Sequence, residues 1–220
     1  MSQFSNVKPI LLAALIVIGL VAETKRASAA ETQVLTVAGG CFWCVEADFE
    51  KVRGVSEAVS GYTGGNVANP TYKQVTRGGT GHYEAVQIRF DPDVVGRDQL
   101  LALFFRSIDP TDAGGQFCDR GESYRTAIFT KGASEKATAQ KALSEAQAAL
   151  GQKIVTPILN AGQFYTAEDY HQNYYKSGER ALTRFGVITR ADAYKRYRDA
   201  CGRDARVRQL WGSAAPFAGG

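Results

Sequence analysis

Apolar residues follow two spacings along the chain, one typical of strands and one typical of helices. Alternating apolar positions predict strands at residues 32–40, 54–65, 82–90, 123–129 and 153–166. Spacings of three and four predict amphipathic helices at residues 41–52, 96–108 and 133–150. Gly151 follows the last helix as a candidate C-cap, and Pro157 makes the last strand an edge strand or a bulged one.

These strands and helices alternate, and no repeat, low-complexity run or Pro/Gly linker divides residues 31–200. The order predicts one domain of the α/β class, an α+β two-layer sandwich in which helices flank a mixed sheet. A domain of this length can bury a core without disulfide staples. Beyond Ala167 the pattern predicts helices and coil, and we expect the C-terminal tail, residues 201–220, to be partly disordered.

The start of the chain has the pattern of a targeting segment. Lys8 precedes an apolar run at residues 9–22, and the Ala-Ser-Ala sequence at residues 27–29 fits a signal-peptidase site. The run is shorter than the roughly 20 residues that a permanent membrane helix needs. We therefore predict a signal peptide at residues 1–30, its cleavage, and export to a bacterial periplasm without stable membrane insertion. An uncleaved anchor is the alternative.

The charge of the chain argues against a nucleic-acid partner. The formal net charge is +4 at pH 7, and no basic stripe is interleaved with aromatic residues. The basic cluster near the C-terminus, "RADAYKRYRDACGRDARVR", is predicted to be the solvated face of a helix. A role in binding nucleic acid is therefore not expected.

Four cysteines make redox chemistry a serious candidate. In an oxidising compartment an even count suggests two bridges, but four cysteines are few for a disulfide scaffold of this length. Cys41 and Cys44 enclose an aromatic pair in "GGCFWC", whereas Cys118 and Cys201 lie far apart along the chain. The first pair is therefore the better candidate for a chemical role.

Cys41 lies where the first predicted strand passes into the first predicted helix. Unpaired N–H groups and the helix dipole stabilise a thiolate at such a junction, so the position predicts a lowered pKa and a nucleophilic sulfur. Gly39 and Gly40 allow another molecule to approach the backbone closely. Cys44 follows one helical turn later, within the roughly 5–6 Å separation that a disulfide allows.

A stapling bridge or a metal site would account less well for the Cys41–Cys44 pair. A bridge that closes so short a loop would remove little chain entropy. A metal site needs a second ligand pair, and His82 and His171 lack the spacing of one. We therefore predict a redox pair and no metal.

The aromatic residues between the cysteines predict an apolar contact for a substrate. Phe42 and Trp43 could pack in the core, but burial of both would draw Cys41 into apolar surroundings and raise its pKa. Exposed rings would instead form an apolar wall beside the sulfur, suited to a methyl or thioether group. We favour the exposed wall.

Seven motifs give the chain a resemblance to one family. It contains, in the order and spacing of peptide methionine sulfoxide reductase A, the motifs "GCFWCVE", "GYTGG", "NPTY", "GTGHYEAV", "DPTD", "SYRTAIF" and "FYTAEDYHQNYY". The resemblance runs from about Thr36 to Tyr175. It implies an enzyme that reduces methionine-S-sulfoxide, free or in proteins, to methionine, and so repairs oxidised exported proteins.

The resemblance also implies roles for five residues, with Cys41 as the nucleophile. Glu84 in "GHYEAV" would be the acid that protonates the sulfoxide oxygen, because a desolvated carboxyl keeps its proton to higher pH. Tyr72 and Tyr124 match the family's hydroxyl donors to that oxygen. Asp119 matches an acidic position that binds the substrate backbone or organises water.

The implied cycle needs a second cysteine and an external reductant. Attack on the sulfoxide would leave Cys41 as a sulfenic acid, which a resolving cysteine converts to a disulfide. Cys44 is favoured because helical spacing alone brings it within reach. Cys201 and Cys118 are the alternatives, and a bridge between those two over the site is also open. A thioredoxin-like dithiol would then reduce the catalytic disulfide, and no metal or organic cofactor is expected.

Two other functions compete with this one. A thioredoxin-like disulfide oxidoreductase also opens a helix with Cys-x-x-Cys, but it needs a cis-proline loop, for which Pro157 is a faint candidate. An exported binding domain stapled by two disulfides is the non-catalytic alternative.

Overall fold

A computed structural model of the protein describes residues 31–219. The signal peptide predicted for residues 1–30 lies outside the described residues and stays a prediction. Within residues 31–219, each helix is too short or too polar to span a membrane.

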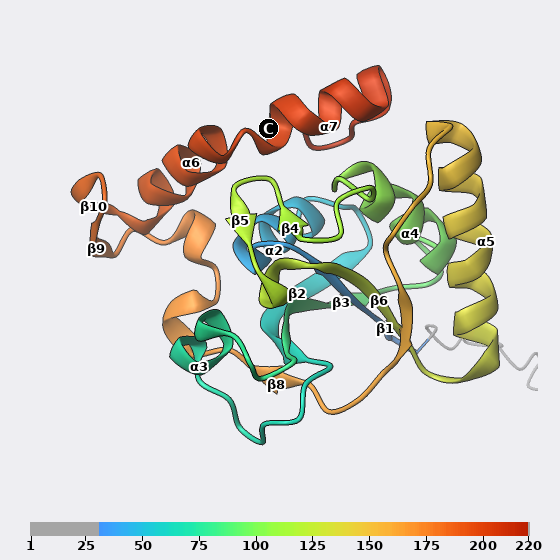
Figure 1. The fold of residues 1–220 in the computed structure, drawn as a ribbon, viewed down its shortest axis with the longest axis horizontal. Helices are drawn as coiled ribbons and strands as arrows, with labels where there is room; N and C mark the ends of the chain where they lie inside the picture. The colour runs from blue at the N-terminus through green and yellow to red at the C-terminus, as the bar shows by residue number, and fades with distance from the viewer. Residues whose placement is uncertain (1–30, 220) are drawn as a thin grey trace, which may run out of the picture. The chain divides into compact units, whose positions relative to one another are not determined.

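A six-stranded sheet, in the order β7-β6-β1-β3-β2-β8, forms the centre of the fold (Figure 1). Its strands are β1 (Gln33–Gly39), β2 (Val55–Thr63), β3 (Tyr83–Phe90), β6 (Thr126–Thr130), β7 (Ile158–Asn160) and β8 (Tyr165–Thr166). Neighbouring strands are antiparallel except β6 and β7, which run parallel. The predicted α/β class with a mixed sheet is thus confirmed.

Helices flank the sheet, and two short ribbons extend from its loops. The α-helices are α2 (Phe42–Phe49), α3 (Tyr72–Arg77), α4 (Arg97–Arg106), α5 (Gly132–Leu150), α6 (Arg190–Cys201) and α7 (Arg203–Trp211). The ribbons are β4 (Gly115–Gln116) with β5 (Asp119–Arg120), and β9 (Arg180–Thr183) with β10 (Gly186–Thr189). The 3₁₀ turns are η1 (Glu122–Tyr124), η2 (Asp169–His171), η3 (Tyr174–Lys176) and η4 (Gly212–Ala214).

Side-chain alternation along β3 assigns residues to the two sides of the sheet. Val86 and Ile88 lie on one side, in a hydrophobic cluster with residues of α2 and α4. Tyr83 and Ala85 belong to a second cluster on the other side. Glu84 has the same parity as Val86, so the pleat turns its carboxyl toward the side that α2 covers.

The structure shortens or divides some predicted elements. The strand predicted at residues 123–129 begins only at Thr126, because η1 occupies the preceding residues. The strand predicted at residues 153–166 is divided into β7 and β8, which form the two edges of the sheet, as Pro157 indicates. The apolar pattern does not predict α3 or the β9–β10 ribbon, because each is too short to repeat a period.

The C-terminal segment folds against the domain, unlike the partly disordered tail predicted for residues 201–220. α7 follows α6 directly, and beyond it the Phe217 ring lies 5.7 Å from the Phe49 ring, centroid to centroid. Arg198 and Arg203 of the basic cluster are only 6% and 2% exposed. The prediction of a solvated face is therefore wrong for these two arginines.

Candidate active site

The junction between β1 and α2 holds Cys41 at the start of a helix, as the sequence predicts. β1 ends at Gly39, and Gly40 has a φ of +81°, in the left-handed region that favours glycine. A Cβ atom on Gly40 would also lie 2.6 Å from the Cβ of Gln116. The Cys41 carbonyl accepts a hydrogen bond from the Cys44 N–H at 3.1 Å, which brings the two cysteines together on one turn.

A cavity of about 270 Å³ opens beside this turn. The residues that the sequence predicts for the site all line it, namely Cys41, Phe42, Trp43, Cys44, Tyr72, Glu84, Cys118, Asp119, Tyr124 and Cys201. The fold therefore gathers these residues from distant parts of the chain into one place. Their chemical roles stay predictions.

Further residues that the sequence does not predict complete the lining. They are Phe117, Arg184, Tyr194, Tyr197, Arg198 and Arg203. Most belong to the C-terminal ribbon and helices, which no motif connects to the site. One signal was available, because Tyr194, Tyr197 and Arg198 are spaced three and four apart and so share a helix face.

Glu84 is buried in the cavity wall as a neutral acid. It is 1% exposed, and its Oε2 atom accepts a hydrogen bond from the Phe42 N–H at 3.0 Å. Burial raises the pKa of Glu84 to about 8; the Phe42 hydrogen bond opposes this shift, and the negative charges of Asp119 and Cys44 add to it. The carboxyl therefore holds a proton at neutral pH, as predicted.

The charge of the two free cysteines differs from the sequence prediction. A hydrogen bond to Cys44, burial, and the negative charges of Cys44, Glu84 and Asp119 raise the pKa of Cys41 well above its usual value. The hydrogen bond from Cys41 instead lowers the pKa of Cys44. In the reduced pair these shifts favour the proton on Cys41 and the thiolate on Cys44. The prediction of a lowered pKa at Cys41 is wrong, because the hydrogen bond to Cys44 and burial outweigh the helix dipole.

Tyr72 and Tyr124 are protonated hydroxyl donors in the cavity wall. Burial, followed by the charge of Glu84, raises the pKa of both above the usual tyrosine value, and their hydroxyls are hydrogen-bonded to each other. Tyr72 is the first residue of α3, where its N–H donates to the Glu168 carboxylate at 2.9 Å. Thr71 forms a capping box before it, which fixes the direction of this helix.

Phe42 and Trp43 line the cavity, but not as the exposed pair that the sequence predicts. Phe42 is 1% exposed and packs against the rings of Tyr72 and His171. Trp43 is half-buried and stacks on Tyr174 with 3.8 Å between ring centroids. The prediction of exposure is wrong for Phe42, because α2 packs against the sheet from its first residue. Core packing and cavity lining are therefore compatible here.

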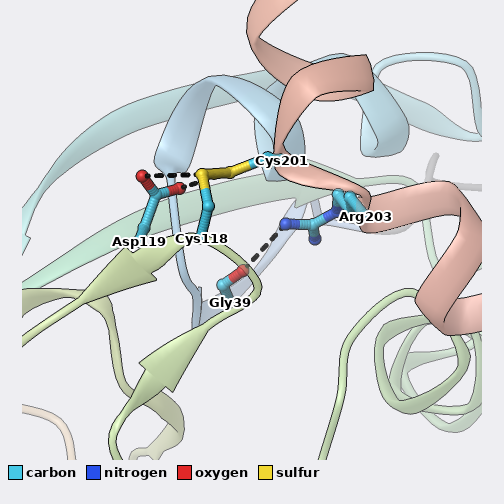
Figure 2. Close-up of a disulfide and its surroundings, with 5 residues drawn as sticks. All are labelled: Gly39, Cys118, Asp119, Cys201 and Arg203. Carbon is cyan, nitrogen blue, oxygen red and sulfur yellow. Dashed lines mark hydrogen bonds between the residues drawn. A yellow bond between two sulfur atoms is a disulfide. The ribbon is translucent and has the colours of Figure 1, made fainter.

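A disulfide joins Cys118 to Cys201 across 83 residues, with 4.9 Å between their Cα atoms. Figure 2 shows it linking the β4–β5 ribbon to the end of α6, with the Asp119 carboxylate beside it. The Asp119 oxygens lie 3.8 and 3.7 Å from the sulfurs of Cys118 and Cys201. Burial raises the pKa of Asp119, although Arg203 and Arg184 oppose the shift. Two of the three candidate resolvers are thus bonded to each other, which leaves Cys44 free beside Cys41.

Two alternative sites, a metal site and a thioredoxin-like site, can be compared with this geometry. Cys118, Asp119 and Cys201 are the one group among residues 31–219 whose potential metal-ligating atoms lie within 4.8 Å of one another. The disulfide occupies both sulfurs, so the closed bridge leaves a single carboxylate. A thioredoxin-like site would need a cis-proline, and every peptide bond of the described residues is trans, including the one before Pro157.

Comparison with known proteins shows which family the chain is similar to. The sequence model of the family described as "Peptide methionine sulfoxide reductase" matches residues 33–202. "Peptide methionine sulfoxide reductase MsrA 2" of Rhizobium meliloti (strain 1021) is 47% identical over 189 residues, covering 86% of this chain and 88% of its own. "Peptide methionine sulfoxide reductase MsrA" of Bacillus subtilis (strain 168) is 46% identical over 183 residues, covering 82% and 97%.

Two solved structures have a similar fold. Mxr1 from Saccharomyces cerevisiae in reduced form is 33% identical with a TM-score of 0.63, covering 66% of this chain and 84% of its own. Methionine sulfoxide reductase A of Corynebacterium diphtheriae is 33% identical with a TM-score of 0.59, covering 67% and 75%.

Proposed function

Because the chain belongs to the peptide methionine sulfoxide reductase family, we propose that it reduces methionine-S-sulfoxide, free or in proteins, with Cys41 as nucleophile and Cys44 as resolver. One observation carries this assignment: Cys41, its free partner Cys44 and the protonated Glu84 line one cavity. A thiol, a second thiol and an acid are the groups that reduction of a sulfoxide requires.

In the first step Cys41 loses its proton and attacks the sulfoxide sulfur, and the oxygen, protonated by Glu84, ends on the Cys41 sulfur. The S–O bond of the substrate breaks and an S–O bond to Cys41 forms, so the cysteine sulfur is oxidised and the substrate sulfur is reduced. Glu84 gives its proton to the oxygen and regains the proton that Cys41 loses. Tyr72 and Tyr124 donate hydrogen bonds to the oxygen. Phe42 and Trp43 contact the methyl group, and Asp119 binds the substrate backbone or water.

In the second step Cys44 attacks the sulfenic sulfur of Cys41. An S–S bond forms, the S–O bond breaks, and the hydroxide leaves as water with the proton of Glu84. A thioredoxin-like dithiol then reduces the bridge and supplies two protons, one to Cys41 and one to Glu84. The electrons come from thiols alone, so the cycle runs without a metal or an organic cofactor.

The cycle predicts a specific bridge after one turnover. The reduced protein is reacted with one equivalent of methionine-S-sulfoxide, its free thiols are blocked, and its disulfides are mapped by mass spectrometry. We expect a Cys41–Cys44 bridge and one equivalent of methionine, and no product from the R epimer. In Cys44→Ser, methionine should still form once, with Cys41 trapped as sulfenic acid. A bridge from Cys41 to Cys118 or Cys201 would refute the role of Cys44.

We also propose that the enzyme acts outside the cytoplasm, where it repairs oxidised exported proteins. The sequence pattern of residues 1–30 supports this. So does the Cys118–Cys201 disulfide, because structural disulfides persist in oxidising compartments.

Export predicts that the full chain, expressed in a bacterial host, appears in the periplasmic fraction without its signal peptide, with a first residue just after the Ala-Ser-Ala motif of residues 27–29. Ala29→Tyr should block the cleavage and leave the protein longer and membrane-bound. N-terminal sequencing of the fractionated protein decides the matter. A protein that still begins with Met1 and is recovered with the inner membrane would indicate an uncleaved anchor. Recovery from the cytoplasm would refute export.

A further inference from the structure

Two arginines of the C-terminal helices lie buried around the resolving cysteine. Arg198 of α6 and Arg203 of α7 line the same cavity as Cys44. A buried guanidinium is costly unless anions or hydrogen-bond acceptors satisfy it. The partners of each arginine therefore indicate whether its charge is available to the cavity.

The charge of Arg198 is neutralised by carboxylates. Its Nη1 donates to the Asp48 Oδ1 at 2.9 Å, and its Nη2 lies 2.8 Å from the Asp204 Oδ1. The Tyr194 hydroxyl and the Phe217 carbonyl accept its remaining hydrogen bonds. Arg198 thus sits in a closed network that joins α2, α6 and α7.

The charge of Arg203 is not neutralised by a hydrogen-bonded carboxylate. Its Nη1 donates to the Gly39 carbonyl at 3.2 Å, as Figure 2 shows, and its Nη2 to the Ser107 carbonyl at 3.0 Å. Its Nε has no partner and lies 4.0 Å from the Asp48 Oδ2, which has none either. Its plane also lies over the Phe117 ring, 4.8 Å from the centroid. Arg203 thus has one ion-pair partner among the described residues, Asp48 at 4.0 Å, and its guanidinium lines the cavity.

We propose that Arg203 is a positioning residue that holds Cys44 as the thiolate of the reduced pair, ready to attack the sulfenic acid of Cys41. This inference rests on the proposed function, in which Cys44 is the resolver. Arg203 is the first residue of α7 and lies just beyond residues 33–202, which the family model matches. The inference therefore gives a part in the chemistry to a helix outside that match.

The other charged and titratable groups near Cys44 agree with this role. The Cys41 thiol donates to Cys44, and Arg203 followed by Arg198 lowers the pKa of Cys44, against the opposing effects of burial and Asp48. Glu84 and Tyr194 also interact with its charge, but both are held neutral by raised pKa values, of which that of Glu84 is about 8. Asp48, through its ion pair with Arg203, and Asp119, whose charged form Arg203 favours, are the carboxylates near this guanidinium. Arg203 is the cation with the largest effect on Cys44.

The test titrates Cys44 directly. In the Cys41→Ser protein with the Cys118–Cys201 bridge closed, Cys44 is the remaining free thiol, and its thiolate absorbs near 240 nm. We expect Arg203→Gln to raise the midpoint by about one pH unit, so that the thiolate fraction falls by up to about tenfold at pH values below the wild-type midpoint. Arg203→Lys keeps the charge and should restore most of the thiolate. Arg208→Gln, on the exposed side of α7, is the matched control and should change nothing.

Single-turnover kinetics give a second readout in proteins that retain Cys41. Formation of methionine should stay within about twofold, whereas bridge formation at pH 7 should slow. A more basic thiolate is a stronger nucleophile, so a tenfold loss of thiolate costs only about threefold in rate. The ratio of wild-type to Arg203→Gln rates should return to one or below at high pH, which a general loosening of the fold would not produce.

Thermal unfolding shows whether Arg203→Gln folds. If it does not, Arg203→Met is titrated instead, because it keeps the length of the side chain and removes its charge, and it should raise the midpoint in the same way. An unchanged midpoint in whichever variant folds overturns the proposal. A bridge from Cys41 to another cysteine, with the midpoint shifted as expected, would refute Cys44 as resolver and leave the effect of Arg203 standing.

Discussion

Replacing Cys41 with serine is expected to abolish methionine sulfoxide reduction while the free energy of unfolding changes by less than about 1 kcal/mol. The sulfur that accepts the oxygen is lost, so the rate should fall at least about 1,000-fold. Stability should hold because Cys41 is half-buried and belongs to no disulfide. The serine hydroxyl can still donate to Cys44. The measurements are a sulfoxide reduction assay and denaturant unfolding.

A comparison with Cys44→Ser makes this result specific. That variant should still release one methionine per enzyme, because it loses only the resolving thiol. Should Cys41→Ser fail to fold, the Cys41–Cys44 pair would instead be a structural element, as in the stapled binding domain. Residual turnover in Cys41→Ser would assign the nucleophile to another cysteine.

The local parts of the site could be predicted because single segments determine them. A strand followed by two glycines and a helix is enough to place Cys41 at a helix start, and the 3.6-residue period is enough to bring Cys44 beside it. The period of two in β3 likewise fixes which face Glu84 shares with Val86. Each of these inferences depends on covalent geometry over a few residues, and each agrees with the structure.

The electrostatics of the site could not be predicted because they depend on distant segments. The helix start alone favours an ionised Cys41, and the correction comes from the hydrogen bond to Cys44 and from burial, which depends on the segments that the fold packs around the site. The same holds for Arg203. It belongs to a strongly charged segment, which predicts solvent exposure, and only the packing of α7 shows that it is buried. The resemblance identified part of the lining of the cavity, but neither its C-terminal side nor the protonation of its cysteines.

The pKa shifts place one proton of the cavity on another group than the sequence predicts. The pKa shifts favour a proton on Cys41 and another on Glu84, the two groups proposed to act on the sulfoxide. The negative charge is left on Cys44, whose turn comes only after methionine has formed. Removing the acid should therefore have the second large effect.

Glu84→Gln should lower the rate of methionine formation by about 100- to 10,000-fold, the usual contribution of a general acid. The amide has the shape of the protonated carboxyl and its oxygen can still accept from the Phe42 N–H, but it has no proton to give. In the wild type only the protonated form is active, and the pKa of Glu84 is about 8. The wild-type rate should therefore fall above about pH 8, whereas the residual rate of the variant should not show this decline. Single-turnover assays across pH measure both.

The same substitution should stabilise the protein, with a pH dependence of fixed sign. The pKa of Glu84 is 4.5 in its ordinary state and about 8 in the fold. Between these values the unfolded chain releases a proton that the folded chain keeps, so wild-type stability falls as pH rises, by up to about 1.4 kcal/mol per unit. Glu84→Gln lacks this loss. The difference in free energy of unfolding between Glu84→Gln and the wild type should vanish below about pH 4 and reach its full size above about pH 8. Equal stability of the two proteins at pH 8 would mean that Glu84 is ionised at neutral pH and cannot be the acid.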